Sequence, residues 1–82
     1  MRHNELIREL EEELEALVIA VPKEEAAYQF YLNLANSTSR EGARKMFLLL
    51  AEQEIDHKKT LEKMMQDIQK ELVSLKSEKK QT

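Results

Sequence analysis

Only one short segment of this 82-residue sequence has the composition of a turn, and this restricts the chain to very few folds. The segment, residues 36–42 (NSTSREG), gathers Asn, Ser and Thr and contains the one glycine of the chain. Thr38 and Glu41 have the spacing of a capping box at a helix start, and Ser39 is a competing cap. With 41% hydrophobic and 35% charged residues around this single break, the sequence predicts an all-α chain built of long helices.

Apolar residues recur every three or four positions on both sides of the turn, as they do on the inward face of a long helix. In the first arm only Glu24 interrupts this apolar stripe, and in the second arm only Glu54 and His57 do so. We therefore expect an antiparallel helical hairpin. The stripe consists of Ile7, Leu10, Leu14, Leu17, Val21, Glu24, Tyr28, Tyr31 and Ala35, and then of Ala43, Phe47, Leu50, Glu54, His57, Leu61, Met64, Ile68 and Leu72.

Pro22 lies inside the first stripe, where a proline removes a helix hydrogen bond and costs about 3 kcal/mol or more. Either one kinked helix continues through it, or an amino-terminal helix ends near Ala20 and Pro22 begins the next one. The stripe keeps its phase through Pro22, which favours the kinked helix. The expected single domain, 1–82, comprises a helical extension at 1–21, a helix carrying Glu24 at 22–36, a turn at 37–42, a helix carrying Glu54 and His57 at 43–76, and a frayed tail at 77–82.

The charge and composition exclude several classes of function. The formal net charge of −3 comes from 13 basic and 16 acidic residues without a continuous basic stripe, which argues against nucleic-acid binding and favours cations. Without cysteine there is no disulfide, thiolate metal site or thiol nucleophile. The apolar runs are too short to span a membrane and the start lacks a signal-peptide pattern, so we expect a soluble cytoplasmic protein.

The three polar interruptions are predicted to meet at one level of the hairpin. Glu24 lies about 15 residues before the turn and Glu54 about 15 after it, so a rise of 1.5 Å per residue places both roughly 22 Å from the turn. His57 is one helical turn beyond Glu54, on the same face. A Glu-x-x-His spacing alone is common in a chain rich in Glu. Three interruptions that share both face and level predict a metal site instead of surface decoration.

Neighbouring polar residues receive other roles. Tyr28 and Tyr31 are expected to fill the core, although either hydroxyl could support a metal ligand through a hydrogen bond. The remaining polar side chains are expected outside the site. Glu25 points about 100° away from Glu24, and His3 lies in a terminus that we expect to be disordered. The other three, Glu52, Gln53 and Asp56, are expected to be solvated.

A two-helix hairpin leaves part of its apolar stripe uncovered, and the economical cover is a second copy related by a two-fold axis. This pairing makes a four-helix bundle with four carboxylates and two imidazoles around one centre, in a homodimer or in a larger ring built of such dimers. Such a centre is severely destabilised without cations, whereas two divalent ions neutralise it. Oxygen ligands with one imidazole per metal suit Fe(II), with Mn(II) or Zn(II) as substitutes.

Two segments, EEAAYQFYLNLA (24–35) and FLLLAEQEIDHKKTL (47–61), resemble the rubrerythrin-like branch of the ferritin-like superfamily. The half-motif of that branch is a Glu seven residues before the Tyr of an aromatic–Tyr pair, followed by Glu-x-x-His on the next helix. The resemblance implies that Glu24 is the ligand of the first helix, that Glu54 is the bridging carboxylate and that His57 is the terminal imidazole. A single half-motif is similar to the encapsulated ferritins, whose ferroxidase centre forms between two subunits.

The resemblance implies a di-iron protein that oxidises Fe(II) with O2 or peroxide, with Glu24, Glu54 and His57 as catalytic ligands and iron storage as a related role. Two alternatives remain open. One is a rubrerythrin-like peroxide reductase that needs an external electron donor, since the chain lacks a rubredoxin-like cysteine set. The other is a non-enzymatic oligomerisation module whose polar layer fixes helix register. The tail LVSLKS only faintly resembles a cargo-targeting peptide, so an encapsulating shell is the least supported partner.

Overall fold

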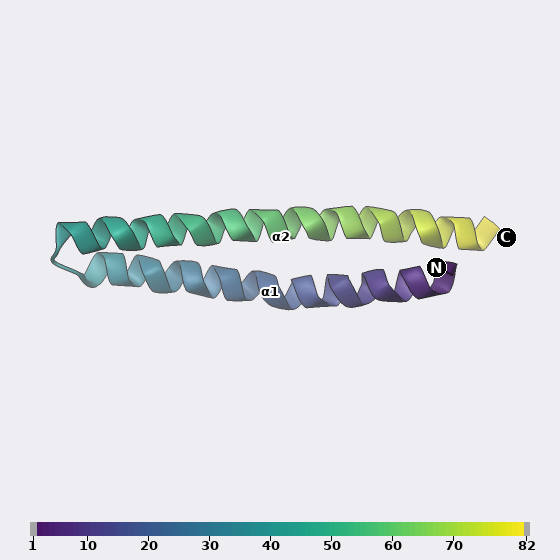
Figure 1. Cartoon of the computed structure of the whole chain (residues 1–82), viewed down its shortest axis with the longest axis horizontal. Coiled ribbons are helices and arrows are strands. Elements are labelled where there is room, and N and C mark those ends of the chain that lie inside the picture. Colours follow the sequence, from purple (N-terminus) through teal and green to yellow (C-terminus); the bar gives the residue numbers. More distant parts are fainter. Residues whose placement is uncertain (1, 82) are drawn as a thin grey trace.

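The protein is an antiparallel pair of long helices, seen in a computed structural model that describes residues 2–81 (Figure 1). Helix α1 spans His3–Ser37 and helix α2 spans Glu41–Gln81. Together they form a rod with extents of 64 × 17 × 14 Å. The predicted all-α class and the antiparallel hairpin are confirmed, whereas dimerisation into a four-helix bundle stays a prediction. Within the described part of the chain, neither helix contains an apolar stretch long enough to cross a bilayer.

Helix α1 continues through Pro22, so the favoured single helix is confirmed and the alternative break near Ala20 is wrong. The expected elements at 1–21 and 22–36 are therefore parts of one helix. Pro22 has no amide hydrogen, so the Val18 carbonyl, four residues earlier, lacks its usual helical donor. In Figure 1 the ribbon of α1 bows away from α2 near its middle, as expected where a proline bends a helix.

Both helices extend further than the sequence indicated. The turn expected at 37–42 is reduced to residues 38–40, because α1 includes Ser37 and α2 already begins at Glu41. The second helix, expected at 43–76, continues to Gln81, and no glycine or proline follows Gly42 to end it sooner. The tail expected to fray at 77–82 is thus helical through Gln81, and its last residue lies outside the described residues.

Thr38 organises the turn, but not through the full capping box that the sequence suggested. Its amide donates to the Leu34 carbonyl at 3.1 Å and ends α1, while its hydroxyl accepts a hydrogen bond from the Arg40 amide at 3.3 Å. Glu41 does not return to the Thr38 amide, because that amide is already bound to Leu34. The Glu41 carboxylate instead pairs with Arg44 on the next turn, at 2.6 Å.

A cluster of buried apolar side chains lies in the half of the hairpin remote from the turn, whereas the most buried single residues, Ala35 and Ala51, lie in the half nearer the turn. The buried residues of this cluster are Ile7, Leu10 and Leu72, against which Leu6, Leu14, Ile68 and Leu75 pack. Among the side chains that the structure describes, eight large apolar ones remain exposed, which is a large number for so short a chain. They are Val18, Ile19, Phe30, Met46, Leu48, Leu49, Met64 and Val73.

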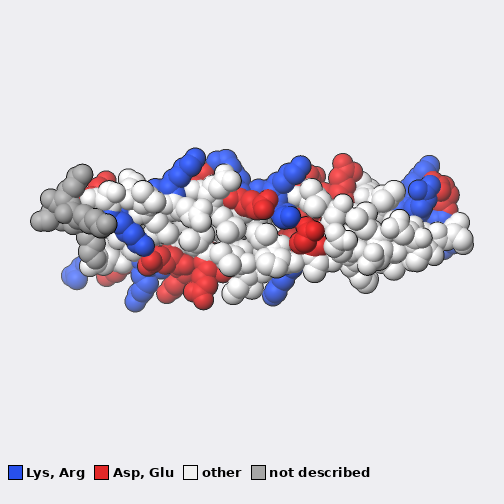
Figure 2. Space-filling model, turned by 180° about the vertical axis from the view of Figure 1, so that it is seen from behind, with Lys and Arg blue, Asp and Glu red and all other residues white. Residues whose placement is uncertain are grey.

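Ion pairs join the two helices along one side of the hairpin. Lys58 Nζ donates to Glu25 Oε2 at 3.0 Å, and Lys76 Nζ donates to Glu11 Oε2 at 3.1 Å. We call this side the charged flank. Figure 2 shows acidic and basic side chains meeting along the seam between the helices on the face opposite to the view of Figure 1.

His3 contradicts the expectation of a disordered terminus without a role. It is the first residue of α1, and its ring Nε2 lies 2.7 Å from the carbonyl oxygen of Leu75 in α2. A ring N–H at this atom donates to that carbonyl and ties together the open end of the hairpin.

Replacing Pro22 with Ala is expected to stabilise the protein by up to about 3 kcal/mol, because a new amide can donate to the Val18 carbonyl and the ring no longer distorts the helix. The matched control is Lys23→Ala, the exposed neighbour whose amide is already present, with an expected change within about 0.5 kcal/mol. Urea unfolding followed by circular dichroism measures both. Equal or lower stability of the Pro22→Ala protein would show that the bend itself contributes to packing.

Candidate metal centre

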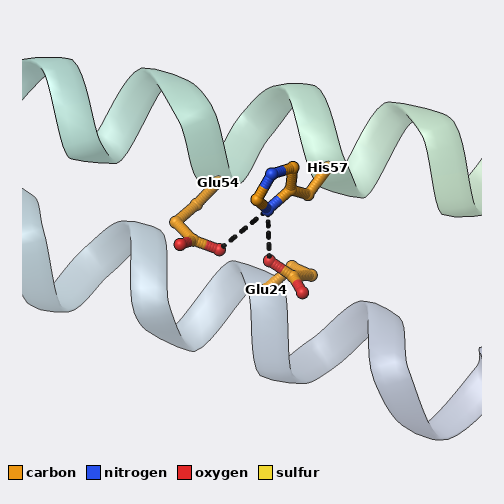
Figure 3. A group of neighbouring side chains, drawn as sticks. All are labelled: Glu24, Glu54 and His57. Atoms are coloured by element: carbon orange, nitrogen blue, oxygen red, sulfur yellow. Dashed lines mark ion pairs between the residues drawn. The ribbon is translucent and has the colours of Figure 1, made fainter.

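Three side chains from the two helices converge at one level of the hairpin (Figure 3). His57 Nδ1 lies 3.5 Å from Glu24 Oε2 and 3.7 Å from Glu54 Oε2. One ligand atom from each residue lies within 4.8 Å of the other two. The structure therefore brings together all three residues that interrupt the apolar stripes, and we call them the Glu–Glu–His group.

The local sequence explains this convergence. Glu54 and His57 are three residues apart on α2, so both side chains project from one face. The ion pair between Glu25 and Lys58 fits the same register, because each of these residues directly follows a member of the group. Glu24 and His57 thus lie on one side of the seam, and the ion pair lies on the other, charged flank.

The two carboxylates are shielded from water and the imidazole is not. The exposed fractions of the side chains are 19% for Glu54, 25% for Glu24 and 61% for His57. Glu24 Oε2 is buried, and it accepts no hydrogen bond within the described residues. An unsatisfied buried carboxylate oxygen is unfavourable, and a cation or a proton placed between these residues would remove that cost.

Glu54 has a raised pKa. The main cause is the hydrogen bond that its protonated carboxyl can donate to Glu24, and partial burial and the negative charge of Glu24 act in the same direction. His57 lowers the pKa of Glu54, but its effect is smaller. The two carboxylates therefore favour any positive species between them, whether a proton or a metal ion.

Glu25 takes a separate role, in agreement with its expected exclusion from the site. The hydrogen bond from Lys58 lowers the pKa of Glu25, and a hydrogen bond from Gln29 adds to this lowering. The same bond to Glu25 raises the pKa of Lys58. Sequence analysis missed this pair. The signal was the placement of an acid after Glu24 and a base after His57, which become opposed once those two residues face each other.

The tyrosines and the outer polar residues are placed as follows. Tyr28 and Tyr31 are half-buried, and the Tyr31 ring contacts Phe30 edge to face with centroids 5.5 Å apart. Over residues 2–81, neither hydroxyl donates a hydrogen bond to Glu24 Oε2, and the expected roles of the two tyrosines stay predictions. The side chains expected to be solvated, Glu52, Gln53 and Asp56, are exposed.

The chemistry of the donors suits a divalent transition metal. Two carboxylate oxygens and one imidazole nitrogen are the ligand types found in Fe(II), Mn(II) and Zn(II) sites. Three donors leave coordination positions open for further ligands. The group could therefore hold a metal ion, and its buried oxygen without a hydrogen bond is the structural feature that fits one.

Comparison with known protein families identifies a relationship. A family model described as Rubrerythrin matches residues 15–82, a region that includes the Glu–Glu–His group, the turn and all of α2. No curated protein and no solved structure matches the chain. The predicted rubrerythrin-like relationship is confirmed, whereas the likeness to encapsulated ferritins stays a prediction.

Without metal, Glu54 is expected to favour the folded state at low pH. Its pKa in the folded chain is raised above the ordinary value of 4.5, so this stabilisation is present below 4.5 and is lost as pH rises through the raised value. Replacing Glu54 with Gln should remove this loss. The measurement is the thermal midpoint against pH in the presence of a chelator.

The exposed neighbour provides the control, because Glu52→Gln changes the formal charge equally and should leave the shape of the profile unchanged. A wild-type protein that gains stability relative to Glu54→Gln as the pH rises through this range would contradict the interpretation.

Proposed function

The chain belongs to the rubrerythrin family, and on that premise we propose that it is a di-iron carboxylate protein that oxidises Fe(II) at a site completed by a second copy of the chain. The observation that carries the proposal is the Glu–Glu–His group, with its buried Glu24 oxygen that has no hydrogen bond. A purely structural polar layer would be expected to satisfy that oxygen internally.

In this proposal Glu24 and His57 of each copy would together complete the ligands of one iron ion, and Glu54 would be the carboxylate shared between two ions. Iron held there supplies one-electron chemistry toward O2 or peroxide. The carboxylates balance the charge of the ions in a shielded setting. His57 presents Nδ1 to both carboxylates, so this nitrogen must be unprotonated when it acts as a ligand. Because the pKa of Glu54 is raised, metal binding should also release a proton from the carboxylate pair at low pH.

The proposed reaction takes Fe(II) as its substrate. Two Fe(II) ions each lose one electron, and O2 accepts the two electrons with two protons to form hydrogen peroxide. With peroxide as the oxidant, the same electrons and two protons yield two molecules of water. Open coordination positions and the partial exposure of His57 would give substrate and oxidant access.

In the proposal, a second copy would cover the side of the hairpin opposite the charged flank. Met46, His57 and Met64 are separated by eleven and seven residues, about three and two helical turns, so they lie along one side of α2. We call this side the open flank. The exposed fractions are 60% for Met46, 47% for Met64 and 61% for the His57 side chain.

Covering the open flank would remove apolar surface from water and bring a second Glu–Glu–His group toward the first. The charged flank is a poorer candidate, because its seam is already closed by ion pairs such as Glu25 with Lys58. The two-copy arrangement would place four carboxylates around two divalent ions, so that the positive charge of the ions neutralises the negative charge of the carboxylates.

The first test is metal binding. We expect two Fe(II) ions per dimer, and His57→Ala should weaken binding tenfold or more because it removes the nitrogen ligand. The matched control is His3→Ala, which changes the other histidine of the chain at the remote end of the hairpin. Anaerobic titration with elemental analysis gives affinity and stoichiometry. Equal iron content in the His57→Ala protein would refute the assignment of ligands.

The second test is catalysis. Aerobic Fe(II) oxidation should be faster with the wild type than with Glu54→Ala, because the shared carboxylate positions both ions, and Glu52→Ala should match the wild type. Stopped-flow absorbance of the ferric product measures the rates. Equal rates for wild type and Glu54→Ala would indicate background oxidation and favour the oligomerisation module. Much faster turnover with peroxide plus a reductant would favour the peroxide reductase.

A further inference from the structure

The methionines of the described chain are divided between two environments. Met46 and Met64 are exposed on the open flank, in line with His57. Met65 directly follows Met64 but is half-buried and lines a groove of about 340 Å³. The groove also involves Val21 of α1 and Glu62, Gln66 and Gln69 of α2. Two adjacent methionines thus differ in their access to solvent.

From this placement we infer that Met46 and Met64 are oxidation sites of hairpins that are not paired, and that their conversion to sulfoxides prevents a second copy from covering the open flank. The inference rests on the proposed function, which supplies both the two-copy assembly and the peroxide. It adds a modification that regulates the assembly of the metal centre.

The chemistry is complete with hydrogen peroxide as the only oxidant. A lone pair of the thioether sulfur attacks one peroxide oxygen, an S–O bond forms and the O–O bond breaks. The sulfur is oxidised by two electrons, and the other peroxide oxygen leaves as water after proton transfer. Hydrogen peroxide is the product that Fe(II) oxidation by O2 would form, or else the oxidant that the centre would consume.

Sulfoxide formation should act on assembly more than on the hairpin itself. A sulfoxide is polar, so burying it between two copies without a donor is unfavourable, whereas a thioether packs well there. Neither Met46 nor Met64 belongs to the buried cluster of Ile7, Leu10 and Leu72. The contacts between α1 and α2 in that cluster therefore remain after oxidation.

The test compares wild type with the double variant Met46→Leu/Met64→Leu, both metal-free in chelator and treated with the same hydrogen peroxide. Peptide mass spectrometry should find oxygen added to Met46 and Met64 sooner than to Met65. Sedimentation should show the dissociation constant of the wild-type dimer rising at least tenfold on treatment, with less than a twofold change for the double Leu variant. Met65→Leu serves as a matched control and should respond like the wild type.

A second variant tests the same idea without an oxidant. Met46→Gln/Met64→Gln places polar groups of similar length on the open flank and should weaken the untreated dimer at least tenfold. An untreated wild-type monomer would refute the two-copy site of the proposed function, and the switch with it. An untreated dimer that remains intact after Met46 and Met64 are oxidised would refute the switch alone.

Discussion

The arrangement of this hairpin depends on two carboxylates that face each other across the seam between its helices. Glu24 and Glu54 occupy positions at which the stripe otherwise places apolar residues. The hydrogen bond that a protonated Glu54 can donate to Glu24, together with partial burial and the repulsion between the two charges, raises the pKa of Glu54. His57 only partly offsets this repulsion, because Glu24 Oε2 still lacks a hydrogen bond within the described residues. A positive species between the carboxylates is thus the one change that would satisfy all three side chains together.

The rest of the chain holds this unfavourable group in place. The cluster of Ile7, Leu10 and Leu72 packs the helices together at the end remote from the turn, and the ion pair of Glu25 with Lys58 aligns them beside the site. Two facing carboxylates destabilise the centre, while apolar contacts stabilise the rest of the hairpin. This combination is expected where a protein loses some stability to maintain a functional site. Under the proposed function, the uncovered open flank would be available to complete a site shared between two copies.

The sequence predicted the centre because helical geometry leaves little freedom. A fixed rise and periodicity set the level and facing of Glu24, Glu54 and His57 once the turn near Thr38 was recognised. Features that depend on side-chain reach were not predictable in this way. Lys58 meets Glu25 through a long flexible side chain, and His3 reaches the Leu75 carbonyl 72 residues later in the chain. Of the predicted capping box, the Thr38 hydroxyl does accept a hydrogen bond from a backbone amide, but Glu41 does not bind the Thr38 amide, because that amide donates to the Leu34 carbonyl.

If the site is divided between two copies, as proposed, metal binding is coupled to assembly. If metal binds the dimer more tightly than the single hairpin, thermodynamic linkage requires that metal strengthen the dimer by the same factor. In the metal-free state the carboxylates of both copies would repel one another, so assembly without metal should be weakest when Glu24 and Glu54 are ionised. A low metal supply would thus expose the open flank with Met46 and Met64, whereas bound iron would keep it covered. The susceptibility of these methionines to peroxide would then report how much of the protein carries metal.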